Sequence, residues 1–157
     1  MEGFKNIINF VIISLDDKFS KNVATILADN LDMYVVNTKD MIAYELINPK
    51  EIKRKCGYEY LKSREMGVVK NMSNFENTVI STSFDIFKEY YEFFDKSIII
   101  YLKLPVEKTR TSPNKISYES RDEFLSSKAD IKLYFERKSK INACKQIIEK
   151  LGELLWI

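Results

Sequence analysis

Histidine is absent from this sequence of 157 residues, and cysteine occurs only twice, at Cys56 and Cys144. Without histidine, the chain cannot carry a Ser-His-Asp or Cys-His catalytic arrangement, nor a zinc site with histidine ligands. The two cysteines lack the C-x-x-C spacing of redox and metal motifs, which favours a reducing compartment over a disulfide-stabilised scaffold. We therefore expect both cysteines to be small, buried apolar residues.

Long apolar runs and an excess of one charge are also missing. The apolar stretches near residues 8–15 and 98–102 are too short to cross a bilayer, and the first stretch has no small-residue cleavage site. Lysine plus arginine number 25 and aspartate plus glutamate number 23, so the net charge of +2 gives no basis for duplex binding. We expect a cytoplasmic protein that binds neither membrane nor nucleic acid.

The chain is long enough, and with 45% hydrophobic residues apolar enough, to form one domain (1–157) around its own core. Short β-branched runs alternate with segments of helical spacing. The predicted strands are residues 7–13, 33–36, 78–82, 97–102 and 130–135. The first predicted helix begins at residue 20. The other predicted helices cover residues 39–46, 49–57, 58–72, 84–94, 118–127 and 139–154. This alternation is typical of an α/β fold with three layers (α/β/α) around a five-stranded parallel sheet.

Ligands of parallel sheets bind at the carboxyl ends of the strands. This rule directs attention to residues 14–22, 37–40, 81–85 and 103–117. The last of these segments is polar and contains Pro113 and Asn114. It is typical of a mobile loop, and we expect a lid-like segment near residues 103–118.

The turn that follows the first predicted strand, residues 14–22 (SLDDKFSKN), contains no glycine. A phosphate-binding loop needs glycines to turn its backbone N–H groups inward, and a lysine and a hydroxyl at fixed positions. In the simpler interpretation, Asp17 or Ser20 caps the helix and Lys18 and Lys21 are solvated. The alternative is an unconventional site for an anion or a nucleotide.

Several segments follow the order of one kinase family. Residues 57–65 (GYEYLKSRE) are similar to a Gly-Glu-x-x-Phe-Arg-x-x-Glu motif of that family. Residues 35–39 (VVNTK) correspond to the place where a strand of the family leads into an Asp-Thr-Asp motif. Residues 79–82 (VIST) correspond to the strand that a triple glycine follows in the family. Ala129-Asp130 matches an Ala-Asp pair that precedes the family's last strand. In this order the chain resembles shikimate kinase, a small P-loop kinase, over nearly its full length. The resemblance implies a P-loop-kinase-like fold.

The resemblance also implies roles for individual positions. The positions that would bind nucleotide phosphates are Asp17, Lys18, Ser20, Lys21 and Asn22. The positions that would bind the acceptor are Asn37, Lys39, Lys62, Ser83 and Arg121. Arg110 resembles the family's lid arginine and is the candidate catalytic residue; no position is a candidate metal ligand.

This sequence departs from the family pattern at the positions that carry the chemistry. Ser20 stands at the phosphate-loop lysine and Lys21 at the magnesium-binding hydroxyl. Lys39 replaces the aspartate that would deprotonate the acceptor, and a lysine at neutral pH cannot act as a carboxylate base. Lys62 replaces an arginine and loses its bidentate fork. The residues Ser83-Phe84-Asp85 replace the triple glycine.

We therefore predict a shikimate-kinase-like protein that is catalytically impaired or inactive and acts as a binding or regulatory module, and we assign it no cofactor. The alternative is an active shikimate kinase that uses ATP and magnesium with unconventional phosphate-binding residues. A third option is a protein-interaction domain with no ligand in its pocket.

The aromatic residues of the segment 84–94 suggest where a partner would bind. They are Phe84, Phe87, Tyr90, Tyr91, Phe93 and Phe94. They cannot all face one side of one helix, so an exposed remainder would offer a surface to a protein partner or a second copy of the chain. A small-molecule ligand is a further candidate partner.

Overall fold

The computed structural model describes residues 8–109 and 114–155. Its sheet has five strands in the order β2-β3-β1-β4-β5, and every neighbouring pair is parallel. The strands are β1 (Phe10–Ser14), β2 (Tyr34–Asn37), β3 (Thr78–Thr82), β4 (Ile98–Lys103) and β5 (Ile131–Tyr134). The predicted five-stranded parallel sheet is confirmed.

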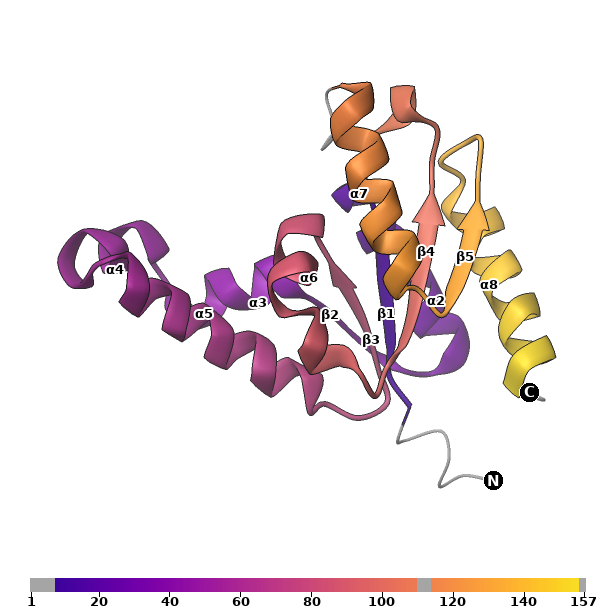
Figure 1. The fold of residues 1–157 in the computed structure, drawn as a ribbon. Helices are drawn as coiled ribbons and strands as arrows, with labels where there is room; N and C mark the ends of the chain where they lie inside the picture. The colour runs from indigo at the N-terminus through magenta and orange to yellow at the C-terminus, as the bar shows by residue number, and fades with distance from the viewer. Residues whose placement is uncertain (1–7, 110–113, 156–157) are drawn as a thin grey trace.

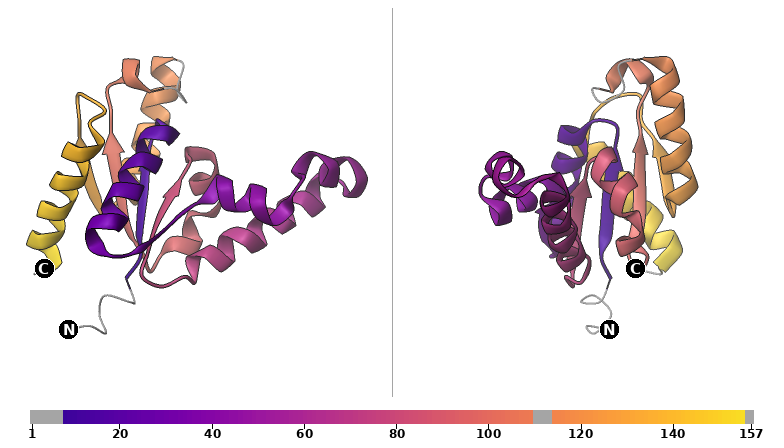
Figure 2. Two further views of the ribbon diagram at one scale, coloured as in Figure 1. Left: turned by 180° about the vertical axis from the view of Figure 1, so that it is seen from behind. Right: turned by 60° about the vertical axis from the view of Figure 1, so that its left-hand side comes forward.

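Helices cover both faces of this sheet, as Figures 1 and 2 show. They are α2 (Asp17–Leu31), α3 (Thr38–Leu46), α4 (Pro49–Cys56), α5 (Tyr58–Ser73), α6 (Phe84–Tyr90), α7 (Lys115–Lys128) and α8 (Lys140–Leu155), with short 3-10 helices η1 (Tyr91–Phe94) and η2 (Val106–Lys108). Helices α2 and α8 pack together on one face, and α5, α6 and α7 contribute to the core on the other. The predicted three-layer architecture is therefore confirmed.

The central strand β1 supplies both cores, because successive side chains of a strand point to opposite faces. Phe10 and Ile12 face the core formed with α2 and α8, whereas Val11 and Ile13 face the core formed with α5, α6 and α7. All five residues of β1 are buried. This explains why its sequence is a continuous apolar run without polar alternation.

Helix α4 projects away from the sheet with the adjoining part of α5, as Figure 1 shows. The Asn48 side chain caps α4, Pro49 occupies its first position, and Gly57 ends it with a φ of 90°. An asparagine cap, a proline at the first position and a glycine at the end are typical of helix boundaries. None of its residues is buried, so the helix adds little to either core.

The structure changes the boundaries of several predicted elements. Helix α2 begins at Asp17 rather than Ser20, and the predicted helix 84–94 divides into α6 and η1. The polar segment is shorter than predicted, because β4 continues to Lys103 and α7 begins at Lys115. The Asn114 side chain accepts a hydrogen bond of 2.8 Å from the Ser117 N–H, which starts α7 earlier than expected.

Two expectations about side-chain exposure are wrong. Cys56 is exposed at the end of α4; only Cys144 is buried, and burial raises the pKa of its thiol. The aromatic side chains of α6 and η1 leave no strongly exposed remainder, since four are buried and Tyr91 and Phe93 are half-buried. The sequence suggested this surface because it could not show that α7 brings Phe124 against the same rings.

No helix in the two described ranges is both long enough and apolar enough to span a bilayer.

Phe87 lies at the centre of this aromatic cluster and is 1% exposed. Its ring packs edge-on against Phe124 and stacks with Phe94. We predict that Phe87→Ala lowers the free energy of unfolding by about 3–5 kcal/mol, because it removes a large buried ring and leaves a cavity. Urea denaturation measures this change. Tyr44→Ala is the control, because Tyr44 is 79% exposed and the same truncation there should change stability by less than about 0.5 kcal/mol.

Helix α7 is also joined to the sheet by a partly buried polar network. The Tyr101 hydroxyl donates a hydrogen bond of 2.7 Å to the Asp122 carboxylate, and Lys103 Nζ lies 3.2 Å from the other oxygen of that carboxylate. Burial, and then the hydrogen bond to Asp122, raise the pKa of Tyr101 well above its ordinary value.

The Tyr101 phenol therefore predicts a pH dependence at alkaline pH. In the unfolded chain it ionises near pH 10, whereas in the folded protein it keeps its proton. Its contribution to stability is full below about pH 10 and falls above it by about 1.4 kcal/mol per pH unit. Urea denaturation at several pH values should show a steeper loss of stability for the unmodified chain than for Tyr101→Phe. Parallel losses would contradict the prediction.

Candidate functional site

The carboxyl ends of β1, β2 and β3 lie side by side, and the turns that follow them bring several predicted positions together. The Asn37 amide donates a hydrogen bond of 2.8 Å to the Ser81 hydroxyl, which joins the ends of β2 and β3. Lys39 Nζ lies 3.2 Å from Asp17 Oδ2, which joins the first turns of α3 and α2. These contacts make one polar edge at the place where ligands of parallel sheets bind.

Asp16 closes the turn between β1 and α2. Its Oδ1 accepts a hydrogen bond of 3.1 Å from the Phe19 N–H, and its backbone conformation is extended, as expected for a helix cap. The predicted cap, Asp17 or Ser20, is therefore wrong. Ser14 Oγ accepts a hydrogen bond of 3.1 Å from the Asp16 N–H, so the backbone donors of Asp16 and Phe19 both have partners within the turn.

Lys138 completes the surroundings of this carboxylate. Its ammonium pairs with Asp16 Oδ2, across 122 positions of sequence, from the segment between β5 and α8. The Asp16 side chain is only 3% exposed, and that of Lys138 is 29% exposed. A buried carboxylate requires such a partner. Sequence reasoning did not single out Lys138, because nothing near it in the sequence points to Asp16.

The five predicted phosphate-binding positions have different surroundings. Ser20 is buried, and its hydroxyl lies 3.3 Å from the Asp16 carbonyl oxygen and 3.2 Å from that of Asp17. Lys21 is exposed and pairs with Asp40 of α3 at 2.5 Å. Lys18 is exposed and Asn22 is half-buried. The structure thus places one lysine in an ion pair with a carboxylate and the serine hydroxyl against the helix backbone.

On the acceptor side, Phe84 and Arg121 lie against each other. The Arg121 guanidinium lies 4.8 Å from the centroid of the Phe84 ring, and Phe84 is 6% exposed. Ser83 is buried, and its hydroxyl has no hydrogen-bond partner among the described residues. The benzyl side chain therefore occupies space at the position where the family has a triple glycine.

Lys62 is held on α5 near Glu65, whose carboxylate lies 3.6 Å from its ammonium. Burial acts to lower the pKa of Lys62, but the negative charge of Glu65 and of other nearby groups outweighs it, so the pKa is raised. Among the described residues, no hydrogen bond or ion pair joins Lys62 or Arg121 to Asn37 or Lys39. The described polar contacts thus join Asn37 to the end of β3 and Lys39 to α2.

The candidate catalytic residue Arg110 lies outside the described residues. The lid-like segment that would carry it is described only as far as Thr109 and again from Asn114.

The residues at this edge differ from those with which P-loop proteins hold a magnesium-bound triphosphate. The N-terminus of α2 is already capped by a carboxylate, and Asp17 adds a second carboxylate in its first turn. Both would repel phosphate oxygens, and the turn has no glycine to expose further N–H donors. In the described part of the chain, no three His, Cys, Asp or Glu residues cluster so as to hold a metal ion.

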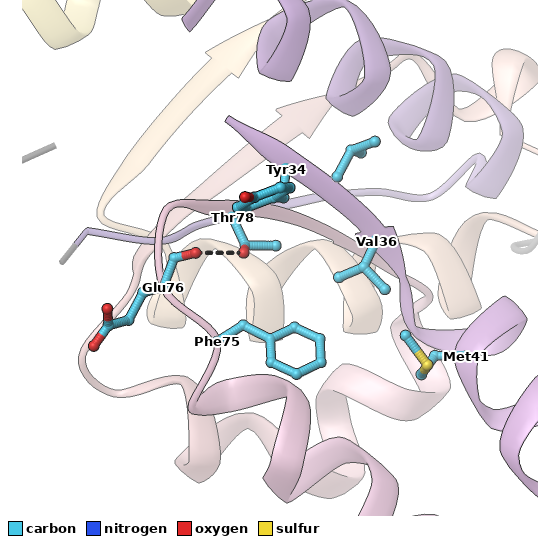
Figure 3. A pocket seen from close by; sticks show the side chains of 7 residues that line it. Tyr34, Val36, Met41, Phe75, Glu76 and Thr78 are labelled. Atoms are coloured by element: carbon cyan, nitrogen blue, oxygen red, sulfur yellow. Dashed lines mark hydrogen bonds between the residues drawn. The ribbon is translucent and has the colours of Figure 1, made fainter. Parts of the chain in front are cut away.

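A pocket of about 370 Å³ lies elsewhere, beside the edge strand β2. Figure 3 shows Tyr34, Val36, Met41, Phe75 and Thr78 around it. It is mainly apolar, and none of the positions identified from the family resemblance lines it.

Comparisons with known proteins agree on fold and family. No curated protein matches this chain, but the shikimate kinase family model matches residues 21–153. The shikimate kinase of Aquifex aeolicus is 22% identical, covers 94% of this chain and 99% of its own, and superposes with a TM-score of 0.74.

Two further solved structures are similar. The shikimate kinase of Acinetobacter baumannii, solved in complex with shikimate, is 18% identical, covers 97% of each chain and has a TM-score of 0.73. That of Bacteroides thetaiotaomicron is 14% identical, covers 96% of this chain and 99% of its own, and has a TM-score of 0.64. These likenesses confirm the fold, and the match of the family model over most of the sequence shows that the chain belongs to the shikimate kinase family.

Proposed function

We propose that this chain is a shikimate-kinase-family protein with a degenerate phosphate-binding loop, that its phosphoryl transfer is impaired or lost, and that it acts as a binding or regulatory module. The observation that supports this proposal is the buried carboxylate of Asp16 at the N-terminus of α2. In a P-loop kinase, this end of the helix faces the phosphates of the nucleotide. In this chain the Asp16 carboxylate accepts the hydrogen bond of the Phe19 N–H at that position.

The residues that phosphoryl transfer needs are replaced at several positions of this chain. Catalysis of that reaction consists mostly of positioning and of stabilising negative charge. Ser20 and Lys21 stand at the phosphate-loop lysine and the magnesium-binding hydroxyl, and Lys39 at the acceptor base. The contacts of these side chains are internal: Lys21 pairs with Asp40, and Lys39 pairs with Asp17. The loss of several catalytic elements at once is better explained by a fold retained for another purpose.

The binding role has two forms under this proposal. One is a small-molecule ligand that is held at the acceptor positions without being phosphorylated. The other is a protein partner or a second copy of the chain. The exposed aromatic side chains available to a partner include three on α3 and α5, where Tyr44, Tyr58 and Tyr60 are 79%, 56% and 47% exposed.

The proposal predicts that ATP with magnesium does not bind tightly. Isothermal titration of the purified chain should give no saturable heat at micromolar protein, with the Aquifex aeolicus shikimate kinase as the positive control. A dissociation constant in the micromolar range would contradict the proposal, because the Asp16 carboxylate would then have to tolerate phosphate beside it.

The proposal further predicts no turnover with shikimate, the ligand of the Acinetobacter baumannii enzyme. A coupled assay of ADP release should remain at the background rate. Lys21→Ala provides the matched control, because release by a contaminating kinase persists in that variant. Shikimate-dependent ADP release that disappears in Lys21→Ala would establish the alternative, an active kinase with unconventional phosphate-binding residues.

A further inference from the structure

We propose that the Asp16 carboxylate is a built-in substitute for the phosphate anion of this fold, with Lys138 as its fixed counter-ion, and that this pair determines the exclusion of phosphate ligands. The inference rests on the proposed function and deepens it. It assigns the loss of phosphate binding to one carboxylate and one ammonium rather than to the missing glycines alone.

The first argument is the hydrogen bonding of the turn. A helix N-terminus presents N–H donors and a partial positive charge, both of which favour an anion. Asp16 Oδ1 accepts from the Phe19 N–H, and the Asp16 carbonyl oxygen accepts from the Ser20 N–H at 3.1 Å. A carboxylate from the chain itself thus supplies the negative charge that a bound phosphate would bring.

The second argument is burial. An ordinary helix cap lies at the surface, where water also solvates its side chain. The Asp16 side chain is 3% exposed, and Lys138 reaches it from a different part of the fold. Burial and the ion pair with Lys138 fix this carboxylate at the start of the helix. An incoming phosphate would have to displace both of these contacts.

The third argument is the contrast with the neighbouring acid. Asp17 follows Asp16 directly, but its side chain is 32% exposed and pairs with Lys39, which is 57% exposed. A solvent-exposed pair contributes little to stability and yields easily to salt. Asp17 therefore provides a matched control, with the same charge one position away but without the buried contact.

Thermal unfolding with and without inorganic pyrophosphate, at constant ionic strength, tests this inference. The midpoint of the unmodified chain should not respond to millimolar pyrophosphate. Asp16→Asn removes the charge and leaves Lys138 unpaired, so pyrophosphate should raise its midpoint by about 3–5 °C. The response should be absent in Asp17→Asn, and it should be lost again in the double variant Asp16→Asn with Lys138→Met.

Equal responses of the unmodified chain and Asp16→Asn would overturn the inference, as would a response of Asp17→Asn as large as that of Asp16→Asn. Should Asp16→Asn not fold, Lys138→Met decides. That variant should lower the midpoint without ligand by roughly 10 °C, since it removes the Lys138 ammonium from a buried carboxylate, and an unchanged midpoint would overturn the inference.

The two proposals fail in different ways. Shikimate-dependent turnover would defeat both proposals, because a working kinase must hold the phosphates of ATP at the start of α2. An absent gain in Asp16→Asn, together with an absence of turnover, would defeat only the inference about Asp16 and Lys138.

Discussion

A carboxylate that is buried at the start of a helix must find hydrogen-bond donors and a cation, and Asp16 finds both. The Phe19 N–H donates to one oxygen and Lys138 pairs with the other. This single group links the end of β1, the first turn of α2 and the segment before α8. It also occupies the end of the helix at which P-loop proteins hold phosphate, so the proposed loss of phosphate binding is assigned to the same contact that stabilises this turn.

The other polar side chains of this edge follow the same pattern of internal pairing. Lys39 lies against Asp17, Lys21 against Asp40, and the Asn37 amide against Ser81. In an open site, cations would remain available for an anionic ligand, but here Lys39 and Lys21 each have a carboxylate from a neighbouring helix. The fold of the shikimate kinase family is retained, while the charges at its ligand-binding edge are largely satisfied within the chain.

The architecture was predictable from the sequence, because the spacing of apolar residues reflects burial: the apolar run of residues 8–15 contains β1, and strands and helices alternate in the predicted order. The candidate site was predictable only in part. The glycine-free turn and its two acids are visible in the sequence. The pairing of Asp16 with Lys138 is not, since a contact across 122 positions leaves no local pattern. The prediction that Cys56 is buried was wrong because the sequence does not show that α4 projects from the fold and buries none of its residues.

A crystal structure determined with a non-hydrolysable ATP analogue and magnesium at millimolar concentration tests the central claim most directly. The Asp16 carboxylate should remain within hydrogen-bond distance of the Phe19 N–H and of Lys138 Nζ, with no phosphate density at the start of α2. A triphosphate seated over Asp16 and Asp17, with the Asp16 side chain displaced from Lys138, would contradict the claim that the chain supplies its own anion.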